Sequence, residues 1–488
     1  MPSTIDRVQP PLEFIPPAFN PLVLRVAQGL LPLWLRSRTA ITQIQASNVE
    51  ELVDCYRQFQ AGKIRFFMAF RHPSTDDPFC MAHLHSSILP RVAKQQGVAL
   101  QHPIHAHFIY DRGIPLWAGS QIGWLYSRLG GTPIHRGKVD RTGLRSARSL
   151  FVDGKLPLAA APEGATNGHN EVISPLEPGV AQLGFWCVED LLKADRSEQV
   201  LIVPMGIQYR YVTPPWQQIE QLMSQLEADS GLSVAESSKG TETPSIKGLQ
   251  GREAALYYRL YSLGEHVLTL MEEFYTRFYH HTLPTQSAPP SGSEDLPEQN
   301  IFQSDQPPVS QADQAFTHRL RALLDVALQV AEQYFDLQAK GSLIDRCRRL
   351  EQAGWDRIYR EDFRNPEGVS LLERGLADRV AEEANLRMWH MRLVESFVAV
   401  TGRYVLEKPT AERFAETTLL MWDMISRIKG NSPFQRPQLG KQTVQMTIGQ
   451  PISVTDRWGA YSADRRGAKQ AIADLTQDLQ IALESMIQ

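Results

Sequence analysis

The stretch Lys63-Ile-Arg-Phe-Phe-Met-Ala-Phe-Arg-His-Pro-Ser-Thr-Asp-Asp77 joins an apolar run to a histidine and two adjacent carboxylates. Its first part, Ile64–Phe70, has the length and the aromatic content of a buried strand, so we predict a strand there. His72 follows this strand, and Asp77 comes five positions after His72. Polar side chains at the carboxyl ends of strands line the crevice in which α/β proteins bind ligands.

Similar short apolar runs recur along the chain and alternate with helical stretches. The predicted strands are His107–Tyr110, Leu156–Ala161 and Val200–Ile207, and the predicted helices include Asn48–Gln60 and Glu177–Ala194. Asn48 is the expected N-cap of its helix, and Glu51 completes a capping box. Pro204 interrupts the last strand, which indicates an edge strand or a bulge. Strands that alternate with helices predict an α/β layer structure.

The character of the chain changes after Tyr211, where long segments with helical periodicity begin. These segments are Gln217–Glu227, Gly251–His281, Ala312–Lys340 and Leu371–Val405. A polar, proline-rich stretch at about 284–311 separates two of them and is typical of a disordered linker. Gln442–Ile452 then alternates as a half-buried strand does, and we expect Ala463–Ile487 to form a final helix.

Length and composition narrow the class of protein. A chain of 488 residues is too long for one ordinary compact core. The net charge of −4 gives no reason to expect a nucleic-acid partner, which would require a strongly basic face. The four cysteines are scattered and show no zinc-site spacing, so we expect no metal and a reducing, cytoplasmic compartment.

The N-terminal part of the chain contains one unusually apolar segment. No stretch approaches the ~20 apolar residues of a membrane span, and the chain does not start like a signal peptide. Residues Pro21–Arg36 are nevertheless mostly Leu and Val, with Trp34 inside the segment and Arg38 just after it. Two interpretations stay open: the segment lies in a membrane interface, or it is an arm packed on the domain.

His72 and Asp77 form a candidate catalytic pair. A histidine within hydrogen-bond reach of a carboxylate is held in one tautomer and becomes a better base, which can take a proton from an alcohol. One such pair is weak evidence by itself, because the chain has 13 histidines and 54 acidic residues. Asp76 is the alternative partner of the histidine, and the segments that follow decide how the pair is interpreted.

Three further segments follow His72 in a fixed order. They are Gly130–Gly137, a glycine-rich turn that carries Arg136, then Ala161–Gly168, which contains Pro162-Glu163-Gly164, and then the strand Val203–Ile207. In order and approximate spacing the set resembles the glycerolipid acyltransferase family. Its bacterial lysophosphatidate acyltransferases, the 1-acylglycerol-3-phosphate O-acyltransferases, carry His-x4-Asp, a Gly…Ile-x-Arg block, Pro-Glu-Gly and a Val-Pro strand. The resemblance covers about residues 48–212.

The resemblance implies a mixed central sheet flanked by helices and a fatty acyl transfer from a thioester to a lipid alcohol. In this family His72 would be the general base and Asp77 would orient it. Arg136, Glu163 and Gly164 would bind the acceptor. The donor would be acyl carrier protein or a coenzyme A thioester, used as a cosubstrate, with no cofactor. The enzyme would be cytoplasmic, would bind the membrane surface peripherally and would serve phospholipid biosynthesis.

The resemblance also predicts the domain organisation. Gln442–Ile452 is similar to a late strand of the family that ends in Gly-x-Pro-Ile, so the large, mostly helical region would be an insertion in the catalytic domain. We therefore expect an apolar arm at 1–47, a core at 48–212, a helical insertion at 213–440, and a return strand and helix of the core at 441–488.

The acceptor is less well specified, because the sequence departs from the family pattern at one point. The family has Glu-Gly-Thr-Arg, with a second phosphate-binding arginine, where this chain has Glu163-Gly-Ala-Thr166. The leading acceptor is 1-acyl-glycerol 3-phosphate, bound by Arg136. The alternatives are a non-phosphorylated lipid alcohol such as diacylglycerol, a hydrolase that uses water, and a non-catalytic helical scaffold at the membrane.

Overall fold

The computed structural model describes residues 7–135, 140–232, 249–283, 311–395, 404–431 and 435–487. The chain divides into two compact units. One unit comprises Met1–Gln9 and Trp216–Pro437, and we call it the helical unit. The other comprises Pro10–Pro215 and Gln438–Gln488, and we call it the sheet unit. The sheet unit is therefore assembled from two distant parts of the chain.

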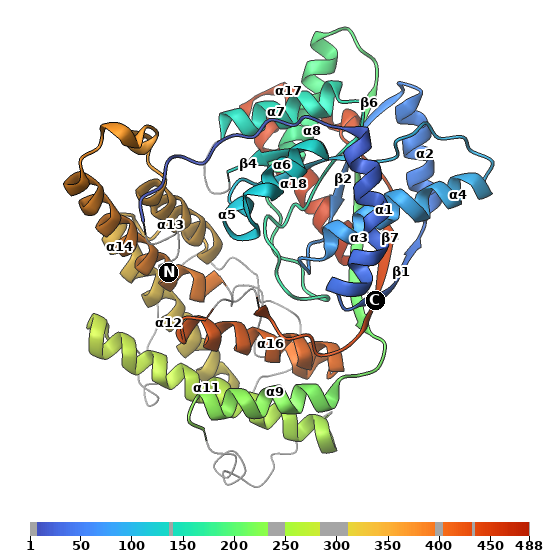
Figure 1. Ribbon diagram of the computed structural model, residues 1–488. Coiled ribbons are helices and arrows are strands. Elements are labelled where there is room, and N and C mark those ends of the chain that lie inside the picture. The colour runs from blue at the N-terminus through green and yellow to red at the C-terminus, as the bar shows by residue number, and fades with distance from the viewer. Residues whose placement is uncertain are drawn as a thin grey trace. The chain divides into compact units, whose positions relative to one another are not determined.

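A mixed sheet forms the centre of the sheet unit (Figure 1). Its strands are β1 (Ile41–Ser47), β2 (Ile64–Phe70), β3 (His107–Asp111), β4 (Gly131–Ile134), β5 (Leu158–Ala160), β6 (Gln199–Tyr211), β7 (Gln442–Ile448) and β8 (Ile452–Ser453). They lie in the order β1-β7-β6-β2-β5-β3-β4, and β8 also pairs with β6. Strands β6, β2, β5, β3 and β4 are parallel, whereas β7 and β8 are antiparallel to β6. The predicted α/β class is confirmed.

Helices cover both faces of the sheet. Successive side chains of a strand point to opposite faces, and here both faces are apolar and need to be buried. In β2, Phe66 and Met68 pack into one apolar cluster, and Phe67 and Ala69 pack into the other. The first cluster contains residues of α1 (Pro21–Arg38), α2 (Val49–Gln60), α3 (Asp77–His83), η2 (Leu84–Ile88) and α4 (Leu89–Gln95). The second contains residues of α7 (Arg141–Asp153), α8 (Gly179–Lys193) and α18 (Arg465–Glu484). The remaining short elements of this unit are α5 (Ile114–Ala118), α6 (Ser120–Arg128), η6 (Thr455–Arg457) and α17 (Trp458–Ala463).

Two local predictions about the sheet need correction. Pro204 was expected on an edge or in a bulge. The edge position is wrong, because β6 is an interior strand with β2 on one side and β7 and β8 on the other. The ladder to β7 and β8 is nevertheless interrupted at Pro204. Pro204 lies between Ile202, which pairs with β8, and Met205, which pairs with β7, so no ladder on that side requires its missing N–H. The strand expected over Gln442–Ile452 is divided into β7 and β8, because the chain turns between them.

The capping box at the start of α2 is also not formed. Asn48 occupies the N-cap position, but its backbone is left-handed, with φ of 57°, and its side chain makes no capping bond. Its amide group instead donates to the carbonyl oxygen of Ile448 at 3.2 Å. A long-range partner in β7 has therefore replaced the local one that the sequence pattern indicated.

The helical unit consists of helices in its described parts. They are α9 (Trp216–Asp229), α11 (Gly251–Tyr279), α12 (Gln311–Phe335), α13 (Leu343–Ile358), η3 (Glu361–Phe363), η4 (Pro366–Gly368), α14 (Leu371–Glu395), α15 (Tyr404–Glu407) and α16 (Ala411–Ile428). Partly buried ion pairs join two of them: Arg319 of α12 bonds Glu265 and Glu272 of α11, each at 2.7 Å. The linker predicted at about 284–311 lies outside the described residues except for its last position. Within the described ranges, no helix has both the length and the apolar character that crossing a bilayer would require.

Candidate active site

His72 and Asp77 lie at the carboxyl end of β2, where the strand meets α3. His72 follows the last residue of β2 by two positions, and Asp77 is the first residue of α3. His72 Nδ1 lies 2.9 Å from Asp77 Oδ2, so the two predicted partners are hydrogen-bonded. The Asp77 side chain is fully buried, whereas the His72 side chain is 23% exposed. The pair thus has a buried acidic end and a solvent-accessible imidazole end.

The Asp77 carboxylate is fixed by donors from three places in the chain. Besides His72, the backbone N–H of Ser74 donates to Oδ2 at 2.9 Å. The hydroxyl of Tyr209, in β6, donates to Oδ1 at 2.6 Å. Since Asp77 only accepts, His72 carries its proton on Nδ1, and the lone pair of the neutral ring is on Nε2. No protein group in the described residues hydrogen-bonds Nε2, so this nitrogen is available to a substrate hydroxyl.

Asp76 is not the partner of His72 in the structure. Its carboxylate makes no hydrogen bond to the imidazole, while its backbone N–H donates to Ser74 Oγ at 3.1 Å. Burial, together with the negative charge of Asp77, raises the pKa of Asp76 to about 6. Two adjacent aspartates therefore have different environments, and the one with three donors faces the histidine.

Glu163 lies after β5, whose carboxyl end is beside that of β2 because Ala69 pairs in parallel with Ala160. Its Oε1 accepts the backbone N–H of His72 at 2.8 Å. Its Oε2 accepts the backbone N–H of Ser174 at 3.0 Å and the side-chain amide of Asn167 at 2.9 Å. The side chain has no exposed surface, and burial raises the pKa of the carboxyl, although Arg71 and the N–H of His72 oppose this.

These contacts give Glu163 a supporting position. The carboxylate that the sequence indicated for acceptor binding holds the backbone of His72 from inside the protein. The next residue, Gly164, has φ of +74°, and a Cβ at this position would overlap the carboxylate of Glu177. The positive φ therefore favours glycine here, and any larger residue would also displace the side chain of Glu177.

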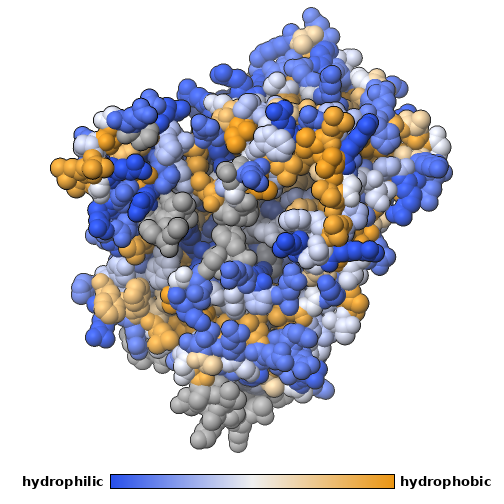
Figure 2. All heavy atoms as spheres, viewed as in Figure 1, coloured by the Kyte–Doolittle hydropathy of each residue, from blue (hydrophilic) through white to orange (hydrophobic). Residues whose placement is uncertain are grey.

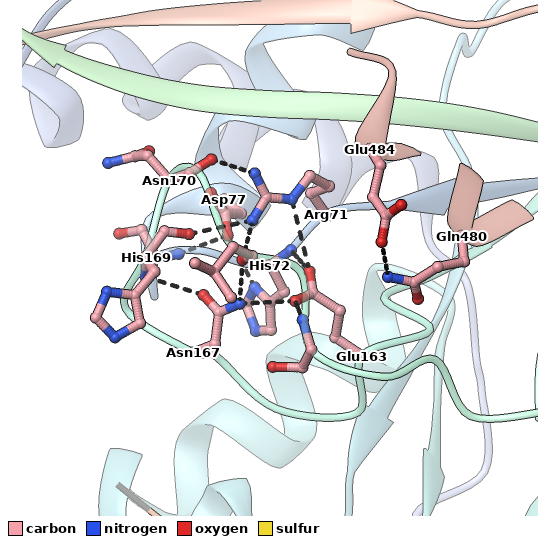
Figure 3. A network of polar contacts seen from close by, with 12 residues as sticks. Arg71, His72, Asp77, Glu163, Asn167, His169, Asn170, Gln480 and Glu484 are labelled. Atoms are coloured by element: carbon pink, nitrogen blue, oxygen red, sulfur yellow. Dashed lines mark hydrogen bonds and ion pairs between the residues drawn. The ribbon is translucent and has the colours of Figure 1, made fainter. Parts of the chain in front are cut away.

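Arg71 holds the loop that follows Glu163 against the end of β2 (Figure 3). Its guanidinium donates to the carbonyl oxygens of His169, at 3.1 Å, and Val172, at 2.7 Å, and also to that of Asn170. The Arg71 side chain is buried, with 1% of its surface exposed. In Figure 3 the loop from Asn167 to Asn170 curves around Arg71 and His72, so a buried cation shapes the wall of the candidate site.

Arg136 lies outside the described residues. β4 ends at Ile134, and its parallel pairing with β3 places His135 at the edge of the sheet where β2 also ends. Asp140 accepts the backbone N–H of His135 at 3.0 Å and forms an ion pair with Arg112, which follows β3. The structure therefore brings His72, Asp77, Glu163 and Gly164 together, and it leaves the position of Arg136 undescribed.

Several histidines near β3 are structural. Burial lowers the pKa of His85 to about 4 and that of His105 to about 3, so both rings are neutral. Each ring hydrogen-bonds a backbone carbonyl oxygen, of Met81 at 2.8 Å and of Leu129 at 2.9 Å. Among the residues that the structure describes, no group of three or more His, Cys, Asp or Glu side chains is arranged to hold a metal ion.

Sequence reasoning missed three residues of this site: Tyr209, Arg71 and Asn167. Tyr209 lies 132 positions after Asp77, and the strand that carries it was expected to end at Ile207. Arg71 directly precedes His72 and follows a buried strand, which was a usable signal because a cation there must find acceptors.

In comparisons with known proteins, the chain matches no family model, no curated protein and no solved structure.

Proposed function

We propose that this protein is an O-acyltransferase that moves a fatty acyl group from a thioester to the hydroxyl of a glycerolipid. The observation that supports it best is the His72–Asp77 hydrogen bond at 2.9 Å, with Asp77 buried and the imidazole accessible. The order of sequence motifs points the same way, since the glutamate of the Pro162-Glu163-Gly164 block contacts the backbone of His72.

The proposed reaction needs one base and no protein nucleophile. Nε2 of His72 takes the proton of the acceptor hydroxyl as its oxygen attacks the thioester carbonyl carbon. The carbon–sulfur bond then breaks, and the proton passes from the imidazolium to the leaving thiolate. Asp77 stabilises the imidazolium that forms in between. General-base catalysis of this kind typically contributes about 10²–10⁴-fold, and positioning of the two substrates must supply the rest.

The proposed donor is acyl carrier protein or coenzyme A carrying the acyl group, and the leading acceptor is 1-acyl-glycerol 3-phosphate. An arginine binds a phosphate in a bidentate manner, and Arg136 is the residue that the sequence resemblance assigns to the acceptor. The loop 165–170 contains no Arg or Lys, which supports diacylglycerol or another neutral alcohol as the alternative acceptor.

Acyl-transfer assays with labelled donor test this proposal. We expect ester product with lysophosphatidate, less with diacylglycerol, and a loss of at least about 10²-fold in His72→Ala and Asp77→Asn. Equal rates with both acceptors would remove the phosphate ester as the preferred acceptor. Free fatty acid as the main product, with or without acceptor, would indicate a hydrolase, and unchanged activity in His72→Ala would contradict the catalytic role of the pair.

We also propose that α1 binds a membrane surface. Leu24, Leu31 and Leu35 are buried, while Leu22, Val26, Leu30, Leu33 and Trp34 are between 46% and 69% exposed. The exposed residues recur every three or four positions and so share one face of the helix, which appears as an apolar strip in Figure 2. Arg36 and Arg38 lie in its last turn, which suits anionic lipid.

The position of α1 relates this surface to the candidate site. Trp34 contacts Phe79 of α3, with ring centroids 5.7 Å apart, and α3 begins with Asp77. A lipid surface against α1 would therefore lie close to the helix that carries the acidic member of the pair. The segment before α1 packs on the sheet unit, where Ala18 N–H donates to the Ser127 carbonyl oxygen at 2.9 Å.

A further inference from the structure

Tyr209 reaches the candidate pair from the neighbouring strand. β6 continues past the end of β2, because Phe70 pairs with Met205 whereas β6 ends at Tyr211. The odd-numbered side chains of this strand, from Val203 to Tyr209, enter the apolar cluster that α3 also enters. Tyr209 is therefore held on the face of the sheet where Asp77 lies, and its hydroxyl meets Asp77 Oδ1 at 2.6 Å.

The direction of this hydrogen bond follows from the number of hydrogens. A tyrosine hydroxyl has one hydrogen and the Asp77 carboxylate can only accept, so Tyr209 donates to Asp77. Cys80 Sγ lies 3.5 Å from the same hydroxyl, whose hydrogen is already used, so the thiol donates to the tyrosine oxygen. Burial raises the pKa of both Tyr209 and Cys80, so both keep their hydrogens. The hydrogen bonds thus run from Cys80 through Tyr209 to Asp77, which also accepts from His72.

We propose that Tyr209 is a positioning residue for acyl transfer: its hydroxyl holds Asp77 Oδ1, so that Oδ2 stays aligned with His72 Nδ1. This inference rests on the proposed function, because it assigns Tyr209 a part in the same reaction. Tyr209 does not touch the substrate in this account. It acts through Asp77, which orients the imidazole while Nε2 takes the proton of the acceptor.

Removing the hydroxyl would leave a buried oxygen without its donor. Asp77 has no exposed surface, so water cannot replace the lost hydrogen bond without a rearrangement. The carboxylate would relieve this by rotating toward other donors, and the imidazole would lose its fixed orientation. Misplacement of a catalytic group by about 1 Å costs on the order of 10²-fold in rate. The main chain would stay in place, because Tyr209 N–H donates to Asn170 Oδ1 at 2.7 Å.

The test compares Tyr209→Phe with Tyr56→Phe in the full-length protein. Tyr56 is a matched control: it is equally buried in the same apolar cluster, but its hydroxyl donates to the backbone oxygen of His105, at 2.9 Å. We expect Tyr209→Phe to lower kcat by about 10–100-fold with KM for both substrates nearly unchanged, and Tyr56→Phe to keep the wild-type kcat. A wild-type kcat in Tyr209→Phe, or an equal loss in both variants, would overturn the inference.

A second readout does not depend on activity. The hydrogen on Nδ1 of His72 gives a downfield proton signal in NMR spectra of protein labelled with ¹⁵N-histidine, and His72→Ala assigns it. We expect the signal to move in Tyr209→Phe and to stay in Tyr56→Phe. If it moves as expected but the wild-type protein transfers no acyl group, the proposed function fails while the positioning contact stands. If it is the same in Tyr209→Phe and wild type, the inference about Tyr209 fails.

Discussion

At the scale of single residues, the adjacent Asp76 and Asp77 show how position decides chemistry. Asp77 accepts hydrogen bonds from His72, Ser74 and Tyr209, and its charge is therefore compensated although it is buried. Asp76 is partly buried, but its carboxylate makes no capping bond at the start of α3. Burial and the charge of Asp77 raise its pKa to about 6. One carboxylate is fully provided with donors, and its neighbour carries an energetic penalty.

This difference predicts the effect of Asp76→Asn on stability. The folded pKa of about 6 lies above the ordinary aspartate pKa of 3.8, so the folded state binds the proton more tightly and wild-type stability falls as pH rises from about 4 to 7. Asparagine removes this dependence. We expect the free energy of unfolding of Asp76→Asn, relative to that of wild type, to increase by about 1–2 kcal/mol as pH rises from 4 to 7.5, after allowance for the partial exposure of the carboxyl. Urea unfolding of both proteins at a series of pH values measures this increase. A difference in unfolding free energy that does not change with pH would contradict the prediction.

At the scale of helices and strands, α1 has two apolar faces with different surroundings. Its buried leucines attach it to the sheet unit, and its other apolar face is exposed. Transfer of apolar surface from water to lipid is worth roughly 25 cal/mol per Å², so insertion of several exposed side chains of α1 would give measurable binding. The arginines in its last turn would add attraction to anionic lipid.

We therefore expect the triple substitution Leu22→Ser, Val26→Ser and Leu30→Ser to lower binding to vesicles with anionic lipid by at least about tenfold, with little change in thermal stability. Vesicle co-sedimentation measures it. A matched control is the triple serine variant of Leu371, Leu372 and Leu376, the exposed leucines of α14. Equal loss in both variants would indicate nonspecific apolar adhesion, and retained binding in the α1 variant would remove the proposed membrane role of α1.

Elements differ in how well the sequence predicts them. The strand Ile64–Phe70 was predicted with its observed bounds, because its apolar run is continuous and ends at a charged residue. The His72–Asp77 contact could also be predicted, because both residues flank one short turn. The hydrogen bond of Tyr209 and the Asn48 bond to Ile448 were not, because their partners lie 132 and 400 positions away. Local periodicity contains no information about such partners.

At the scale of the whole molecule, the sheet unit is interrupted by the helical unit between β6 and β7. The interruption starts and ends at neighbouring points: Tyr211 pairs with Gln442, and Val212 N–H donates to the Lys441 carbonyl oxygen at 2.9 Å. The two strands are antiparallel there, so a short turn can join them. Both apolar clusters of the sheet unit are made only of its own residues.

This connectivity predicts that the sheet unit folds alone. A chain of residues 10–215 and 438–488, joined by a short Gly/Ser loop, should unfold cooperatively and keep the downfield Nδ1–H signal of His72, because a shorter loop costs less entropy to close. The fragment 216–437 should be less stable than the helical unit within the whole chain, because the fragment lacks Gln9, whose N–H donates to the Ile358 carbonyl oxygen. Circular dichroism measures the unfolding of the joined chain and of the fragment, and NMR measures the His72 signal of the joined chain. An unfolded joined chain would show that the sheet unit requires the helical unit to fold, and acyl transfer by a folded one would place the whole reaction in the sheet unit.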